Sequence, residues 1–448
     1  MRTVLLSLTV TLLAAAPAVA AQRTVTVPSP GPGPAAYDKV TYTPIGPASA
    51  RTVLVLVPGY YGGAGDFRLV GREIVRRVRG LQVWAVDRRS QPLEDTKMFD
   101  DARAGRVSVR QAFDYYLGWL ADPSVTTHYQ PPDVTKLGFA KRWGLDVALD
   151  GIRRIVLRAR RQGKRVILGG HSLGGSLTTI YATWDFDGHP GYRDVDALLL
   201  IDGGTLGTFA TPTLQQTREE LAKLQAGSPF ADVIGFGLPW AAGVFAQAGA
   251  VAALREPTAP SIGQAFALLP AGYKPPVPAT NRGLLGYAFD KQTSASDPSL
   301  QANLGHLATT GDPRDWVDDD EATPLRRLAD VFSGSPNSTE WFFPERLRIE
   351  VDAAQELRRN AQTRLLALRP WHLAEVDRPL YAYQTDLTNG GVLRGARRFV
   401  ARSESPRALA RFVDGSKTDS HLDPLTAAPR TSRFLQTVVP WLRRVLDR

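Results

Sequence analysis

The amino-acid sequence predicts an α/β fold: a mostly parallel, doubly wound sheet with a large, mainly helical cap inserted before its last strands. Four apolar runs lack polar alternation and end at Pro, Gly or Asp, which is typical of parallel strands covered on both faces. The runs are 52–57, 81–86, 165–168 and 197–201. Segments with helical periodicity lie between them, and alternation of strand and helix indicates a doubly wound sheet.

The alternation stops after residue 205 and returns near residue 376. The intervening segment is rich in Gly, Pro, Ala and Trp, with helical stretches but no clear run of sheet strands. After it we expect a strand, a helix, a last strand and a closing amphipathic helix, in this order: 379–383, 393–400, 409–413 and 432–446. We therefore predict a core in two parts, 37–205 and 376–448, with an inserted cap over 206–375.

The N-terminus predicts export. Arg2 precedes an apolar run over 4–16, and Ala18-Val19-Ala20 then forms a small-x-small cleavage pattern. We predict a signal peptide over 1–20 and a Pro/Gly-rich spacer over 21–36, and hence a secreted or periplasmic protein. A retained membrane anchor is the alternative, but the apolar run is short for a span of ~20 residues.

Composition narrows the classes of function. The 448 residues include no cysteine, which excludes disulfides, thiolate metal sites and a cysteine nucleophile. The net charge of +10 lies on Arg-rich helix faces such as 152–161, which we interpret as a solvated surface and not as a nucleic-acid site. Transient contact with an anionic membrane or lipid surface fits this charge, and no protein partner is indicated.

A motif of type G-x-S-x-G follows the third predicted strand directly. Gly170-His171-Ser172-Leu173-Gly174 ends that strand and begins a helix of good helix formers. A nucleophile elbow requires this placement, because the sharp turn exposes a serine at the sheet edge while glycines avoid collisions with neighbouring backbone. The other interpretation is a Gly-rich turn that merely contains a serine. The context favours Ser172 as a nucleophile.

This motif, the earlier loop Pro58-Gly59-Tyr60-Tyr61-Gly62-Gly63 and a late Asp and His together resemble the α/β-hydrolase superfamily, over 37–205 and 376–448. The resemblance implies a Ser–acid–His triad in that chain order, acting on esters or related acyl compounds. By matching, the backbone N–H groups of Leu173 and Tyr60 would form the oxyanion hole. Pro58 stands where the superfamily has a His, which is a departure, although the donor itself is a main-chain group.

His421 is the predicted base among six histidines. It lies in a polar loop after the last predicted strand, where the superfamily places its base, and a neutral imidazole can take the serine proton and later protonate the leaving group. For the acid, Asp386 follows the strand at 379–383, which is the usual superfamily position. Asp202 ends the fourth strand and is the alternative acid. We prefer Asp386.

Residues 233–254 carry no charge. Their length would permit a membrane helix, but their place inside the insertion favours a cap element that lines a pocket for an apolar acyl group. The sequence thus predicts an exported serine esterase or lipase-like hydrolase working through an acyl-enzyme, with a small-molecule or lipid ester as substrate and no metal or organic cofactor. The alternatives are an acyltransferase or peptidase with the same triad, or a non-catalytic binding protein on this scaffold.

Overall fold

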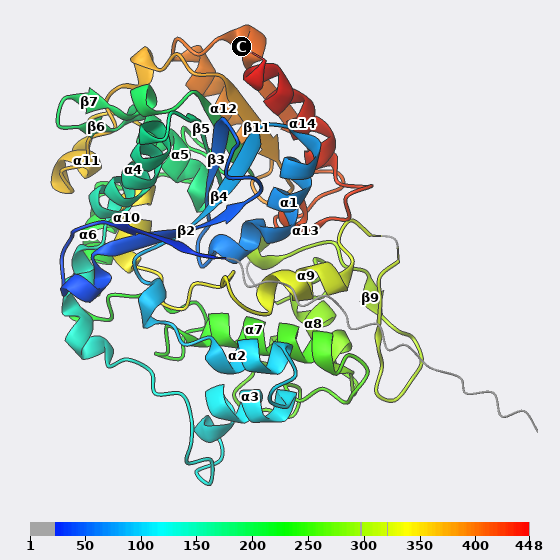
Figure 1. Ribbon diagram of the computed structural model, residues 1–448. Coiled ribbons are helices and arrows are strands. Elements are labelled where there is room, and N and C mark those ends of the chain that lie inside the picture. Colours follow the sequence, from blue (N-terminus) through cyan, green and yellow to red (C-terminus); the bar gives the residue numbers. More distant parts are fainter. Residues whose placement is uncertain (1–22, 296–297, 320, 448) are drawn as a thin grey trace, which may run out of the picture.

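An eight-stranded sheet forms the centre of the computed structural model, which describes residues 23–295, 298–319 and 321–447 (Figure 1). The predicted signal peptide lies outside the described residues. The strand order is β1-β2-β4-β3-β5-β8-β11-β12. The pairs β1–β2 and β2–β4 are antiparallel, and the remaining pairs are parallel. The predicted mostly parallel α/β sheet is therefore confirmed.

The predicted strands are present, with slightly different ends. The strands of the sheet are β1 (Val25–Pro28), β2 (Lys39–Ile45), β3 (Thr52–Val57), β4 (Leu81–Asp87), β5 (Arg165–His171), β8 (Ala197–Ile201), β11 (Leu380–Gln384) and β12 (Arg411–Asp414). The sequence did not predict β1 and β2. Of these, β1 lies inside the stretch interpreted as a spacer and pairs with β2 at the antiparallel edge. A short hairpin, β6 (Asp185–Phe186) and β7 (His189–Pro190), lies outside the sheet.

Helices cover both faces of the sheet, as its uninterrupted apolar strands require. Successive side chains of β3 alternate between two apolar cores, with Val53 and Val55 in one and Leu54 and Leu56 in the other. The first core is closed by α4 (Leu145–Arg161), α5 (Leu173–Thr183) and α12 (Gly391–Ala401), and the second by α1 (Arg68–Arg77) and α14 (Arg433–Leu446).

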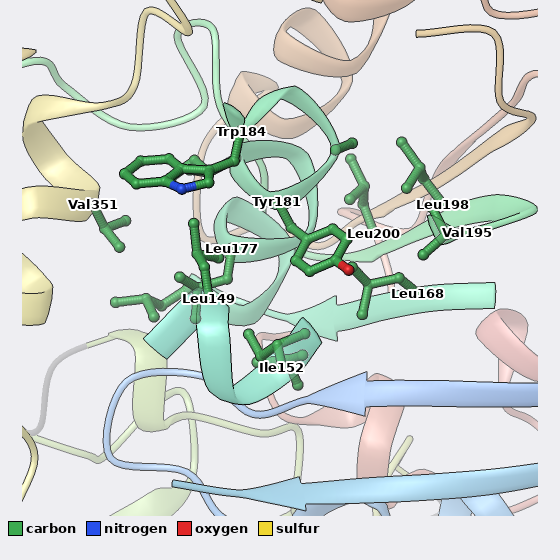
Figure 2. Close-up of a cluster of buried hydrophobic side chains, with 14 of the residues drawn as sticks. Leu149, Ile152, Leu168, Leu177, Tyr181, Trp184, Val195, Leu198, Leu200 and Val351 are labelled. Atoms are coloured by element: carbon green, nitrogen blue, oxygen red, sulfur yellow. The ribbon is translucent and has the colours of Figure 1, made fainter. Parts of the chain in front are cut away.

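Helix α5 is held firmly in the first core. In Figure 2, Leu177 and Tyr181 pack between side chains of α4 and of the strands β5 and β8, and Trp184, the residue after the helix, lies on the side of Val351. Every residue of α5 is buried. Truncation of such a core side chain to alanine typically costs about 2–5 kcal/mol. The turn that precedes α5 is therefore mounted on a rigid element.

The chain between β8 and β11 is mainly helical. It contains α6 (Leu214–Ala226), α7 (Ala241–Arg255), α8 (Asn281–Phe289), α9 (Leu325–Phe332), α10 (Glu345–Ala353), α11 (Ala361–Leu365) and the pair β9 (His306–Leu307) and β10 (Trp316–Val317). Helix α7 covers 241–254 of the uncharged stretch 233–254 and ends one residue beyond it, at Arg255. No helix among the described residues is long and apolar enough to cross a membrane.

A second segment joins this helical layer. Helices α2 (Lys97–Arg103) and α3 (Val109–Tyr116) lie between β4 and α4 in the chain, yet they pack against α7 below the sheet (Figure 1). An aromatic cluster that includes Phe99, Tyr116 and Trp341 joins the two segments. The layer over the sheet edge is thus built from two separate parts of the chain.

Candidate active site

Ser172 lies at the turn between β5 and α5 with φ 55° and ψ −124°, a backbone conformation that residues other than glycine rarely adopt. Tight contacts enforce this turn. A Cβ atom at Gly174 would lie 2.0 Å from the carbonyl oxygen of Val57, and one at Gly203 would lie 1.9 Å from that of Ser172. These glycines allow the strand ends to approach the turn closely, so the strained serine is held by its surroundings.

His421 lies in the loop between β12 and α13 (Asp423–Thr426), and its ring contacts Asp202. The His421 Nδ1 and Asp202 Oδ2 atoms are 2.5 Å apart, and both side chains are buried. Asp202 also accepts hydrogen bonds from the backbone N–H of Thr385, at 2.7 Å, and from its hydroxyl. Burial acts to raise the pKa of Asp202, but the hydrogen bonds from His421 and Thr385 outweigh it and hold that pKa below its ordinary value.

The structure corrects the preferred acid. The carboxylate of Asp386 accepts a hydrogen bond from the Ser420 hydroxyl at 3.2 Å and pairs with Lys291, so it is engaged beside the histidine loop and not with the His421 ring. The cause is the register of β8 and β11. The N–H of Asp202 donates to Tyr383 O, which places Thr385 beside the Asp202 carboxylate and turns Asp386 elsewhere. Asp202, the alternative acid, occupies the position next to His421.

His171 supports the histidine loop, a role that the sequence did not indicate. Its ring lies 4.3 Å from the His421 ring, and its Nε2 atom is 2.9 Å from the His421 carbonyl oxygen. Burial and, next, the neighbouring His421 lower the pKa of His171 to about 3. The ring is therefore neutral and donates its Nε2 proton to that carbonyl.

Asp423 fastens the histidine loop to the helical layer. Its carboxylate accepts from the Ser420 N–H at 2.7 Å, the Asn303 side chain at 2.7 Å and the Thr323 hydroxyl at 2.7 Å. Asn303 and Thr323 belong to the segment between β8 and β11. The position of His421 therefore depends on contacts with that segment as well as on the sheet.

Ser172 and His421 line the same cavity, which has a volume of about 160 Å³. Its walls are mostly apolar, with small or aliphatic side chains of α7 and α8 such as Ala246, Gly249 and Leu284. Among the six histidines, His171 and His421 line this cavity; His189, His306 and His372 pair with acidic side chains elsewhere, and His128 stacks on Trp119.

The loop after β3 forms the wall beside Ser172. A Cβ atom at Gly59 would lie 2.9 Å from Ser172 Cβ, and the Gly62 N–H closes a turn onto Gly59 O at 3.2 Å. Tyr60 and Tyr61 are the central residues of this turn, and Tyr61 has φ 55°. Leu173 is the first residue of α5, so its N–H lacks a partner within the helix. Of the predicted oxyanion residues, Leu173 thus follows Ser172 directly, and Tyr60 belongs to the loop that contacts Ser172 and lines the same cavity.

The described residues contain no group of three or more His, Cys, Asp or Glu side chains arranged to hold a metal ion. The sequence matches no protein-family model and no curated protein.

Solved structures that align with the chain include a candidate lipase from Sulfolobus solfataricus, at 14% identity and a TM-score of 0.48, covering 94% of this chain and 93% of that one. A carboxylesterase structure from Nitrososphaera gargenis aligns at 13% identity and a TM-score of 0.42, with coverages of 94% and 99%. Epoxide Hydrolase A from Mycobacterium thermoresistibile aligns at 13% identity and a TM-score of 0.43, with coverages of 94% and 98%. The strand order, the elbow between β5 and α5 and the helical insertion after β8 show that this chain has the α/β-hydrolase fold.

Proposed function

We propose that this protein is an exported serine hydrolase that cleaves carboxylic esters with an apolar acyl group. One observation carries the proposal: a histidine bound to a buried carboxylate shares a cavity with a serine held in a strained turn. Nucleophile, base and orienting acid are the parts that acyl transfer through a serine requires. The part of the proposal that concerns export rests on the N-terminal sequence.

Ser172 is the nucleophile. In the first step its Oγ forms a bond to the ester carbonyl carbon while His421 Nε2 takes the hydroxyl proton. The negative charge that develops on the carbonyl oxygen is stabilised by the N–H groups of Leu173 and Tyr60. The tetrahedral intermediate then collapses, the bond to the alcohol oxygen breaks, and His421 returns the proton to the leaving alcohol. Water repeats the sequence on the acyl-enzyme and releases the acid.

Asp202 is the orienting acid. It accepts a hydrogen bond from the Nδ1–H group of His421, and this tautomer leaves Nε2 free to take the serine proton. The low pKa of Asp202 keeps the carboxylate ionised at neutral pH, where its charge stabilises the imidazolium that forms during the reaction. The carboxylate is fully buried, so water does not screen this interaction.

The walls of the cavity support an apolar acyl group. Helix α7 carries no charge from Ala241 to Leu254, and its side chains along the cavity are alanine or glycine apart from Phe245. Each CH₂ group buried there contributes ~0.8 kcal/mol, which is about fourfold in kcat/KM. A serine at the elbow also argues against epoxide-hydrolase chemistry, which uses an aspartate at that position in similar folds.

A panel of chromogenic esters from acetyl to palmitoyl tests the proposal. We expect hydrolysis that improves with chain length and then levels off once the cavity is filled. The variant Ser172→Ala should lose this activity, whereas Ser176→Ala, which changes another buried serine in the first turn of α5, should keep it. Flat inactivity of the wild type across the panel contradicts ester hydrolysis. Product analysis with added alcohols distinguishes hydrolysis from transfer to another acceptor.

A further inference from the structure

A buried arginine lies behind the loop that contains Tyr60. Arg88 follows β4, and its side chain is only 8% exposed. Its guanidinium donates to three carbonyl oxygens of the loop: Pro58 at 2.7 Å, Gly59 at 2.9 Å and Gly62 at 3.2 Å. The flat guanidinium carries five N–H groups in a fixed geometry, so it can donate hydrogen bonds to several carbonyl oxygens of one turn at the same time.

The bond to Gly59 bears directly on Tyr60. The carbonyl of Gly59 and the N–H of Tyr60 belong to one peptide group, which is planar and trans, so the two point in opposite directions. When Arg88 holds the carbonyl on one side, the Tyr60 N–H is held toward the other. A hydrogen bond to the carbonyl also polarises the same peptide and strengthens its N–H as a donor.

Glu340 holds the arginine in place. Its Oε2 atom lies 2.6 Å from Arg88 Nη1, its other oxygen accepts from the Ser90 hydroxyl, and its own N–H donates to Tyr61 O at 2.7 Å. The Glu340 side chain is 5% exposed. One residue therefore binds both the guanidinium and the strained turn, and it comes from the segment that follows α9.

We propose that Arg88, held by Glu340, is a positioning residue that orients the Gly59–Tyr60 peptide so that the Tyr60 N–H meets the oxyanion. This inference rests on the proposed function. It also means that the inserted segment completes the oxyanion site, because Glu340 lies more than two hundred residues beyond Arg88 in the chain. The contribution belongs to the transition state, since the oxyanion does not exist in the bound ester.

The test compares Arg88→Lys and Glu340→Gln with Arg89→Lys. Arg89 is the neighbouring arginine, is also largely removed from solvent and donates to Ser29, next to the edge strand β1, so it is a matched control. Lysine keeps the charge of Arg88 but cannot span the three carbonyls. We expect Arg88→Lys to lower kcat by roughly 10- to 100-fold with little change in KM, because complete loss of one oxyanion donor costs about 10²–10³ in kcat.

Glu340→Gln keeps an acceptor for Arg88 and should lower kcat less, by about threefold to tenfold, a fraction of one donor's effect. The second readout is the affinity for a trifluoromethyl ketone, which forms an oxyanion when it binds a serine. That affinity should fall in parallel with kcat across the variants, whereas binding of an unreactive alcohol should not change. All rates are expressed per folded molecule, counted by intrinsic fluorescence.

Unchanged kcat and ketone affinity in Arg88→Lys overturn the inference, as does an equal loss in Arg89→Lys, which would indicate a general effect on folding. If Arg88→Lys does not fold, Glu340→Gln decides alone: full kcat and full ketone affinity in that variant contradict the inference. An inactive wild type is a different result, because it contradicts the proposed function itself.

Discussion

Replacement of Asp202 by asparagine should disable the base without disturbing the fold. The Asp202 Oδ1 atom accepts from the backbone N–H of Thr385, a donor that cannot reverse its polarity. In Asp202→Asn the single amide oxygen must therefore remain there, and the NH₂ group takes the place of Oδ2 against His421 Nδ1. His421 must then accept at Nδ1 and carry its proton on Nε2, which is the wrong tautomer for taking the serine proton.

Loss of the correct tautomer lowers kcat by about 10⁴ in the serine-protease triad, which corresponds to about 5 kcal/mol of transition-state stabilisation. We expect a fall of that order for Asp202→Asn, measured on a butyryl chromogenic ester, with an unchanged circular-dichroism spectrum. Asp386→Asn is the matched control and should retain at least a tenth of the activity, because that carboxylate contacts Ser420 and Lys291. Greater loss in Asp386→Asn than in Asp202→Asn refutes the reasoning.

Three other changes have distinct expected outcomes. Gly249→Leu should reduce kcat/KM for palmitoyl esters much more than for acetyl esters, because the new side chain would occupy the cavity. A Cβ atom at Gly249 has one neighbour within 4 Å, Leu285 Cδ1 at 3.4 Å, so the fold can accept the change. Equal losses on both esters would count against an acyl site along α7. Burial raises the pKa of Asp87 to about 7 in the folded protein, whereas an aspartate in an unfolded chain has a pKa of about 4. The protonated carboxyl therefore stabilises the fold fully below pH ~4, and this contribution is lost as the pH rises through about 7. In urea unfolding, the free energy of unfolding of the wild type should fall over that pH range by up to about 4 kcal/mol more than that of Asp87→Asn. Parallel plots of this free energy against pH for the two proteins would contradict the prediction. His171→Phe should lower the free energy of unfolding by about 1–3 kcal/mol, because the His421 carbonyl loses its buried donor; an unchanged denaturation midpoint would show that this bond is not needed.

Local sequence patterns were sufficient for the parallel strands of the sheet and for the elbow. Strands such as 52–57 are apolar on both faces because helices cover both, and this alone marks them as buried parallel strands. The turn at Ser172 was recognisable because Gly170 and Gly174 lie within two residues of it, whereas the close approach of Gly203 comes from a later strand end and gave no local signal. In contrast, β2 contains alternating polar residues and Pro44 and lies near the antiparallel edge, so its pattern was weak.

The acid and the supports of the site were not predictable in the same way. The choice between Asp202 and Asp386 depends on how β8 and β11 pair and on the course of the loop that carries His421. Spacing along the chain does not encode either. Arg88 gave no signal because its partner, Glu340, comes from a distant segment, and the packing of α2 and α3 on α7 is likewise a long-range property.

The most direct test of the central claim is the site of covalent labelling by a fluorophosphonate, determined by mass spectrometry of the digested protein. The account predicts one adduct on the peptide that contains Ser172, with labelling slowed severely in His421→Ala because the serine then lacks its base. An adduct on another residue, or equally fast labelling of Ser172 without His421, would contradict the claim that these two side chains act together.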